Sequence, residues 1–279
     1  MPLNLYRPPP GLTAQDKLHE TTPAGEYDLN FVFPVPEELR SEGAVLMKPL
    51  VPSEHAEVLF NQLVKYPDMF RYLPYTFTTL PQFYLFLESN RREPGTILFV
   101  VYDLSLTFPD GDGEGEGEGE GDKEMDKRRV AGFLGLIKGS EQNRSAELAH
   151  LNILPPFHRS HITTHTCSLL LQYLFSTLHL RRAQWYSNAF NSPSIAAAQR
   201  LGFRLEGEQR WERVLAVGKE GLELPAWAEQ EEREMGRGPG RHSCVLGMGW
   251  DEWKEGGEEK VRGLMKREVS KRREDELKR

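Results

Sequence analysis

The sequence has few of the features that mark secreted proteins, membrane proteins or dinucleotide-dependent oxidoreductases. Its 279 residues include two cysteines, Cys167 and Cys244, which are too few for a disulfide framework and fit a reducing compartment. No stretch approaches the roughly 20 consecutive apolar residues that a membrane-spanning helix needs, and the first residues lack the apolar core of a signal peptide. No Gly-x-Gly-x-x-Gly turn follows a predicted strand. We therefore expect a cytoplasmic protein with no membrane segment.

The net charge of −7 arises in one segment. Residues 110–126 contain nine acidic residues and one lysine, a net charge of −8, so the rest of the chain has a net charge of +1. Alternating glycine and glutamate cannot pack, since glycine has no side chain and the glutamates repel one another. We expect residues 109–127 to form a disordered insertion, either a tolerated loop expansion or an acidic docking segment. The near-neutral remainder indicates no nucleic-acid partner.

The clearest alternation of strands and helices spans residues 146–207. The elements expected there are a strand at 146–154, a helix at 161–178, a strand at 182–187, a helix at 192–202 and an extended segment at 203–207. Pro155 and Pro156 end the first strand, because proline cannot donate a hydrogen bond to a sheet. Ser192 is expected to cap the second helix, and Gly202 to follow its last turn in the left-handed conformation.

The flanking segments continue this pattern on both sides. Further strands are expected at 44–50, 96–104, 129–138, 210–217 and 241–248, and helices between Pro52 and Pro67 and at 80–90. A stretch rich in glutamate, arginine and glycine at 225–241 is expected to be a loose loop. The chain then divides into an extended N-terminal arm at 1–29, a folded domain at 30–253 and a charged tail or helix at 254–279.

Two short motifs connect this pattern to a known family. Asn191-Ser192-Pro193-Ser194 is followed by Leu201-Gly202-Phe203-Arg204-Leu205-Glu206-Gly207. Together with the order of elements, these motifs resemble the GNAT superfamily of acyl-CoA-dependent N-acetyltransferases over residues 30–253. The nearest likeness is to its ribosomal-protein-alanine acetyltransferase-like branch, of fungal type. The resemblance implies an α/β (α+β) fold in which a mixed, mostly antiparallel sheet is splayed between two strands and flanked by helices.

The resemblance also implies where CoA binds. In the family the pyrophosphate lies against backbone N–H groups at a helix start, which lack intrahelical partners and lie at the positive end of the helix dipole. The pattern Gln/Arg-x-x-Gly-x-Gly/Ala corresponds here to residues 158–163, where His161 and Thr163 replace small residues. The loop is thus less permissive for positive φ and for a close phosphate, and Arg159 offers a compensating charge. The implied CoA-binding residues are Ile153, Leu154, His158, Arg159, Ser160, His161, Ile162, Thr163 and Asn191, with acetyl-CoA as co-substrate and no metal.

Acetyl transfer needs a base that removes a proton from the amine and a group that stabilises the leaving thiolate. Glu147 lies where the resemblance places a base or a water-positioning carboxylate; the other interpretation is a surface or ion-paired strand residue. His150 is a second candidate base, which strand alternation places on the opposite face. Ser194 is expected close to the CoA sulfur, with helix capping as the other interpretation for it and for Asn191. No nucleophilic cysteine with a paired histidine is visible, so we expect direct attack of the amine on the thioester.

Two functions of different kinds fit these residues. The first is transfer of an acetyl group from acetyl-CoA to a primary amine on a protein N-terminus, a polyamine or a small amino compound. The alternative is a non-catalytic acyl-CoA-binding or interaction module on the same fold. The acceptor site is expected between the segments Phe70–Tyr75 and Trp211–Leu215, although the aromatic residues of the first segment also fit a purely structural core.

Overall fold

The computed structural model describes residues 3, 5, 11–13, 15–106 and 129–266. The expected insertion at 109–127 and the part of the tail beyond residue 266 lie outside the described residues. Within the described ranges, no helix is both long and apolar enough to cross a membrane.

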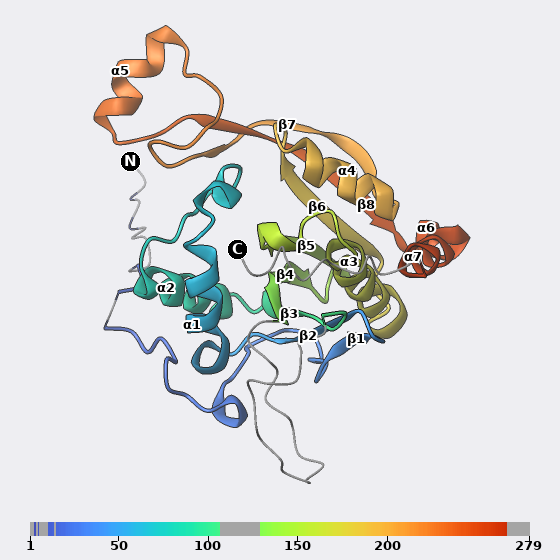
Figure 1. Ribbon diagram of the computed structural model, residues 1–279. Coiled ribbons are helices and arrows are strands. Elements are labelled where there is room, and N and C mark those ends of the chain that lie inside the picture. The colour runs from blue at the N-terminus through green and yellow to red at the C-terminus, as the bar shows by residue number, and fades with distance from the viewer. Residues whose placement is uncertain (1–2, 4, 6–10, 14, 107–128, 267–279) are drawn as a thin grey trace.

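One sheet of eight strands organises the described part of the chain (Figure 1). The strands are β1 Leu39–Ser41, β2 Val45–Pro49, β3 Ile97–Asp103, β4 Val130–Ser140, β5 Ser145–Ile153, β6 Arg182–Asn188, β7 Arg204–Val214 and β8 Gly240–Gly249. Their order across the sheet is β1-β2-β3-β4-β5-β6-β8-β7. Every neighbouring pair is antiparallel except β5 and β6, which are parallel. This confirms the mixed, mostly antiparallel α/β fold, with one change: β7 is continuous where the sequence predicts two separate extended segments.

Helices cover both faces of the sheet. They are α1 Pro52–Leu63, α2 Leu80–Arg91, α3 Ile162–Gln172, α4 Ser192–Leu201, α5 Ala226–Glu234, α6 Trp250–Glu252 and α7 Glu258–Met265, with short turns η1 Ala24–Glu26, η2 Pro67–Phe70 and η4 Pro155–Phe157 and π-helical turns η5 Tyr173–Thr177 and η6 Trp253–Gly257. In Figure 1, α1 and α2 lie on one side of the sheet and α3 and α4 on the other. The segment expected to be a loose loop at 225–241 contains α5, which corrects that expectation.

The ends of α4 show which local predictions the structure supports. Gly202 follows the helix with φ 111°, in the left-handed region, as predicted. The N-cap is Asn191 rather than Ser192, since the Asn191 side chain accepts a hydrogen bond from the Ser194 amide at 3.3 Å. A side-chain oxygen at this position satisfies a backbone donor that the helix leaves free.

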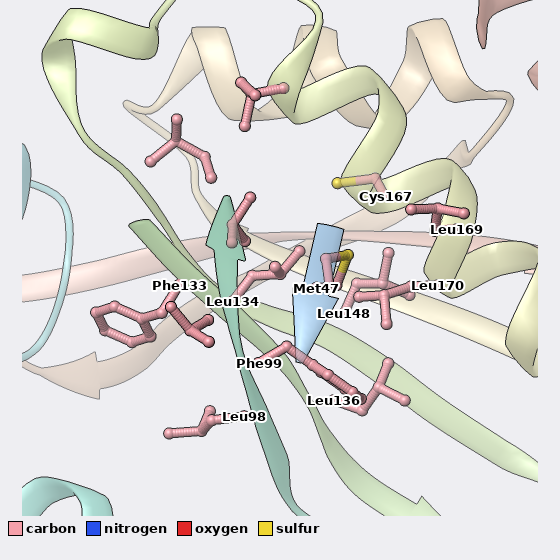
Figure 2. Close-up of a cluster of buried hydrophobic side chains, with 14 of the residues drawn as sticks. Met47, Leu98, Phe99, Phe133, Leu134, Leu136, Leu148, Cys167, Leu169 and Leu170 are labelled. Atoms are coloured by element: carbon pink, nitrogen blue, oxygen red, sulfur yellow. The ribbon is translucent and has the colours of Figure 1, made fainter. Parts of the chain in front are cut away.

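The core beneath α3 fixes that helix on the sheet. Figure 2 shows Met47, Phe99 and Leu148 from three strands packed against Leu170 and Cys167 of α3. All five are less than 5% exposed. Cys167 is a free thiol, and burial raises its pKa to about 12, so it behaves as the small apolar residue that the sequence predicts.

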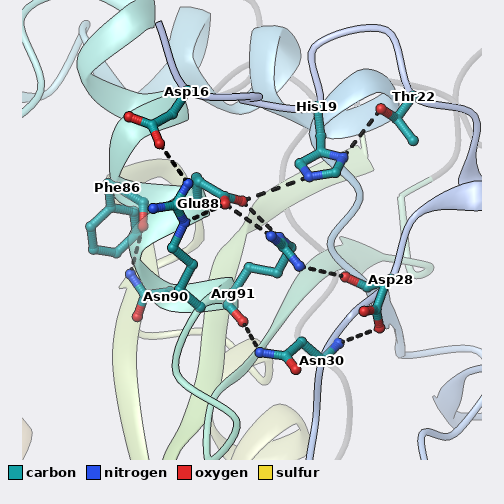
Figure 3. Close-up of polar contacts among 10 residues, drawn as sticks. Asp16, His19, Thr22, Asp28, Asn30, Phe86, Glu88, Asn90 and Arg91 are labelled. Atoms are coloured by element: carbon teal, nitrogen blue, oxygen red, sulfur yellow. Dashed lines mark hydrogen bonds and ion pairs between the residues drawn. The ribbon is translucent and has the colours of Figure 1, made fainter. Parts of the chain in front are cut away.

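The N-terminal arm is tied to α2 by a polar cluster (Figure 3). Glu88 is 2% exposed and pairs with Arg91 at 2.6 Å and Arg92 at 2.8 Å. Arg92 also pairs with Asp16 of the arm at 2.8 Å, and His19 of the arm lies 3.9 Å from the Glu88 carboxylate. The arm is therefore held by specific ion pairs over this stretch as well as by apolar contact.

Candidate active site

A gap opens in the sheet where β5 and β6 separate. The two strands pair from Ser145–Arg182 to Leu148–Trp185, and beyond these pairs each runs on without the other, β5 to Ile153 and β6 to Asn188. The last residues of β5 therefore have an edge without a strand partner. An extended ligand can add to such an edge like a missing strand. The start of α3, the start of α4 and a buried polar cluster all lie at this gap.

On the α3 side, the loop 158–161 leads directly into the helix. The left-handed residue of this loop is Arg159, with φ 57°. His161 has φ −70° and Thr163 lies within α3, so neither position needs a glycine conformation. The His161 side chain is buried and points inward, 3.3 Å from Asp103 Oδ1 and 3.2 Å from the Ala44 carbonyl. The expected obstruction by His161 is thus absent, because its ring lies in the core and only its backbone is available to a ligand.

Free donors are present at this helix start. The Ile162 amide donates to Ser160 Oγ at 3.3 Å, whereas the amides of His161, Thr163 and Thr164 donate to no group in the described ranges. Arg159 is exposed and forms no ion pair with a described residue. These amides and the arginine fit a diphosphate, which needs several N–H donors and positive charge.

Arg200 is a contact that the sequence analysis missed. This α4 residue donates from Nη2 to Thr164 Oγ1 at 3.5 Å and so lies over the first turn of α3. Nothing in the sequence spacing indicates this, because it depends on the packing of α4 against α3.

The other residues predicted to contact CoA surround the end of β5. Ile153 and Leu154 have buried side chains. The Leu154 amide donates to the Ala131 carbonyl at 2.8 Å, and the Ile153 carbonyl lies 2.7 Å from His158 Nε2. The His158 ring is thus held against β5 and is positioned by it.

Ser194 lies in the first turn of α4, above β6. Its Oγ accepts a hydrogen bond from Trp185 Nε1 at 3.0 Å, so the hydroxyl proton of Ser194 is free to donate elsewhere. Asn191 uses its Oδ1 as the helix cap. The structure therefore supports capping for Asn191, and it shows Ser194 as a half-buried hydroxyl whose orientation is fixed by an indole.

Glu147 lies on the opposite face of the sheet, the face covered by α1 and α2. It is 4% exposed, and Lys138 Nζ lies 2.8 Å from its Oε2. Burial raises the pKa of Glu147, and Lys138 offsets part of that rise. Lys138 also lies 4.3 Å from the ring centre of Tyr186 on β6. The result is a buried carboxylate with a raised pKa beside the gap, the property that a general base requires.

His150 lies on the same face as Glu147, which corrects the prediction of opposite faces. The register of β4 with β5 shifts between Gly135–Ala149 and Phe133–Asn152, and His150 has φ 53°. A bulge of this kind inserts a residue and resets the side-chain alternation. The His150 ring therefore packs against Phe86 of α2, with the ring centres 5.1 Å apart.

Tyr75 and Asn152 join His150 in a hydrogen-bonded group. Tyr75 Oη lies 3.1 Å from His150 Nδ1 and accepts from Asn152 Nδ2 at 2.9 Å. Burial lowers the pKa of His150 to about 4 and raises the pKa of Tyr75, so both are neutral near pH 7. The sequence indicates Tyr75 only as an aromatic residue near the acceptor site and gives no signal for Asn152.

The segment Phe70–Tyr75, expected to border the acceptor, is fastened to the β7–β8 connection that follows the other expected segment. Lys219, in the β7–β8 connection, donates from Nζ to the carbonyls of Phe70 and Tyr75 at 2.8 and 2.9 Å. Arg71 and Glu220 form a second link. Next to this link, Trp211 and Arg213 line an open hollow of about 360 Å³ together with Trp227 of α5. The described residues contain no cluster of three or more His, Cys, Asp or Glu side chains that could hold a metal ion.

Comparison with known proteins agrees with this architecture. The model of the acetyltransferase (GNAT) domain matches residues 45–204. Curated proteins give no match.

Solved structures with the same fold span most of the chain. A probable GNAT-family acetyltransferase from Chromobacterium violaceum is 24% identical with a TM-score of 0.60, covering 90% of this chain and 100% of its own. A GCN5-related N-acetyltransferase from Brucella melitensis is 21% identical with a TM-score of 0.64, covering 88% and 95%. Spermidine N-acetyltransferase from Vibrio cholerae, in complex with CoA and spermine, is 14% identical with a TM-score of 0.52, covering 76% and 99%. Because the domain model matches more than half of its residues, the chain belongs to the GNAT acetyltransferase family.

Proposed function

We propose that the protein transfers an acetyl group from acetyl-CoA to a primary amine by direct attack of the amine on the thioester. The observation that carries the proposal is the gap between β5 and β6, with free helix-start amides on one face and the buried carboxylate of Glu147 on the other. We also propose that, within the GNAT family, the protein belongs to the ribosomal-protein-alanine acetyltransferase-like branch of fungal type.

The α3 face supplies the contacts for the coenzyme. The amides of His161, Thr163 and Thr164 and the Arg159 guanidinium bind the diphosphate, with Arg200 adding positive charge over the first helical turn. The free edge of β5 pairs with the pantetheine amides, which is how an extended chain adds to a sheet. This places the thioester in the gap, between Ser194 and Glu147.

The proton of the amine is removed on the opposite face of the sheet, where Glu147 lies. Glu147 accepts a proton from the amine, either directly or through a water molecule, and its buried environment raises its pKa toward the working range. The new bond joins the amine nitrogen to the acetyl carbon, and the bond from that carbon to sulfur breaks. Ser194 can stabilise the departing thiolate by donating a hydrogen bond to the sulfur, because its oxygen already accepts a hydrogen bond from Trp185 and its hydroxyl proton is available.

Incubation with acetyl-CoA and a panel of primary amines tests the proposal, with acetylated product measured by mass spectrometry. The panel holds a peptide with a free N-terminus, spermidine and small amino compounds. Turnover that depends on an amine supports the transferase. Stabilisation by CoA in a thermal-shift assay without product from any amine would instead support the non-catalytic acyl-CoA-binding module.

A further inference from the structure

Arg241, in β8, is buried and forms no ion pair with an acidic residue of the part of the chain that the structure describes. The residue is 7% exposed, and its Nε donates to Ser243 Oγ at 2.9 Å. Ser243 Oγ in turn donates to Glu212 Oε2 at 3.0 Å, so one edge of the guanidinium is fixed. Among the described residues, no group accepts a hydrogen bond from Nη1 or Nη2, and no carboxylate forms an ion pair with Arg241.

The charged groups around Arg241 leave one positive charge unbalanced. Glu212 pairs with Arg213 at 3.0 Å, and Glu147 pairs with Lys138 at 2.8 Å. Among the described residues, both carboxylates near Arg241 are thus already paired with a cation. The group contains three cations, Lys138, Arg213 and Arg241, but only these two carboxylates. Arg213 also lies directly opposite Arg241 in the β7–β8 register. Like charges in that position destabilise a sheet, so the structure alone gives no reason for a second arginine.

The neutral groups nearby do not remove this excess. Tyr75 faces Arg241 from the segment after α1, and burial raises the pKa of its phenol, so it carries no charge near pH 7. His150 is neutral as well, since burial lowers its pKa to about 4. An unpaired buried charge is costly, and an anion from outside the chain would compensate it.

Arg241 and Glu147 lie on opposite sides of the gap between β5 and β6, and on the same face of the sheet. Glu147 is on β5, Arg241 is on β8 just beyond the end of β6, and the Glu147 carboxylate is close enough for its charge to act on Arg241. From these positions we propose that Arg241 is an oxyanion subsite, and that the acceptor is a primary amine with a carboxylate close to its amino group. The amine meets Glu147 and the carboxylate meets the free edge of Arg241, which suits two parallel hydrogen bonds. This inference rests on the proposed function.

A polyamine is a poor fit for the same site. Each of its amines beyond the reacting one adds a positive charge to a cluster that already has an excess. An amino acid or a similar zwitterion brings one negative charge to the unpaired guanidinium. Of the three acceptor classes that the proposed function leaves open, the charge balance around Arg241 therefore disfavours polyamines and favours small amino compounds that carry a carboxylate.

Matched acceptor pairs test the subsite in the full-length protein. The pairs are alanine and ethylamine, leucine and 3-methylbutylamine, and phenylalanine and 2-phenylethylamine, with spermidine and a C-terminally amidated tripeptide as further acceptors. Product is measured by mass spectrometry at saturating acetyl-CoA. We expect kcat/KM to be higher for the carboxylate member of each pair, and lowest for spermidine.

The basicity of each acceptor amine is the same whether wild type or Arg241→Gln is assayed. Comparing the two enzymes therefore isolates the recognition of the carboxylate by Arg241. We expect Arg241→Gln to lower kcat/KM for the carboxylate acceptors by about 10- to 100-fold, mainly through KM, and to leave the matched amines within about threefold. Arg241→Lys should keep part of the preference, because it retains the charge and loses the planar fork. Arg210→Gln, on an exposed part of β7, is the matched control and should behave as wild type. CoA-dependent thermal stabilisation should be the same in all four proteins.

Each outcome decides one claim. A wild-type preference for spermidine or for the simple amines would overturn the subsite and leave the transferase standing. An equal loss for both members of each pair in Arg241→Gln would show a structural role only. If kcat/KM were equal for the amidated tripeptide and the free amino acids, Arg241 would bind a neutral carbonyl of the acceptor. The proposal that it binds a carboxylate would then be wrong. Absence of product from every amine would reject the proposed function itself. If Arg241→Gln does not fold, Arg241→Lys provides the same comparison with wild type, because it retains the charge and removes the planar fork.

Discussion

The variant Lys138→Met provides the sharpest test of Glu147 as the base. Lys138 Nζ lies 2.8 Å from the Glu147 carboxylate, and the side chains are 51% and 5% exposed. An opposite charge at this range lowers a carboxyl pKa, and solvent screening of the half-exposed lysine weakens the effect. Lys138 therefore favours the ionised form of Glu147 and offsets part of the effect of burial.

The direction of the effect follows from the state in which a base works. Glu147 accepts a proton only when ionised, so kcat/KM falls as the pH drops through its pKa. Burial raises this pKa and Lys138 lowers it, so removing Lys138 raises it further. We expect the acidic limb of the profile of kcat/KM against pH to move to higher pH. Acetylated product is quantified by mass spectrometry at each pH, because thiol reagents themselves respond to pH.

Two further variants make this prediction refutable. Lys65→Met removes an exposed lysine of the segment after α1, whose Nζ donates to Gln62 Oε1 at 3.1 Å, and should leave the profile unchanged. Glu147→Gln should abolish the limb and lower kcat by about 10²- to 10⁴-fold. If Lys138→Met shifts the limb downward or not at all, or if Glu147→Gln keeps wild-type kcat, Glu147 is not the base.

Three other predictions concern the coenzyme site and the fold. Arg159→Ala should weaken CoA binding about tenfold in isothermal titration calorimetry, since an exposed charge–phosphate contact is partly screened; an unchanged Kd would remove Arg159 from the site. Ser194→Ala should lower kcat and leave the Kd for CoA near wild type, and the opposite pattern would make Ser194 a binding residue. Glu88→Gln should lower the free energy of unfolding by about 1–3 kcal/mol in urea titration, because two arginines lose a buried carboxylate. The hydrogen bonds of those arginines outweigh burial and lower the pKa of Glu88, so this difference should be present above pH 4.5 and disappear as the pH falls through the lowered pKa.

Much of the fold could be predicted because its signals are local. Prolines at 155 and 156 end β5, apolar periodicity marks α3, and Gly202 marks the end of α4. The helix α5 also has a local signal, since its run of alanine, glutamate, glutamine and arginine contains strong helix formers. In that segment the overall composition predicts a loop, whereas intrinsic propensity favours the helix that forms.

The candidate site was harder to predict because its geometry depends on contacts between distant segments. The bulge at His150 has no sequence signature, and it moves that residue to the face of Glu147. His161 turns inward because Asp103, far away in the sequence, lies behind it. Arg241 stands in an ordinary strand pattern, and only the positions of β5 and β7 reveal that its charge is unpaired.

The separation of β5 from β6 has a consequence for the order of events. The helix-start amides and the Glu147 cluster occupy opposite sides of the sheet, and the two strands part between them. The thioester and the amine can then approach from different sides and meet inside the opening, so neither has to depart before the other arrives. The hydrogen bonds from Lys219 Nζ to the carbonyls of Phe70 and Tyr75 lie on the amine side, so exchange of the spent coenzyme on the other side does not require them to break.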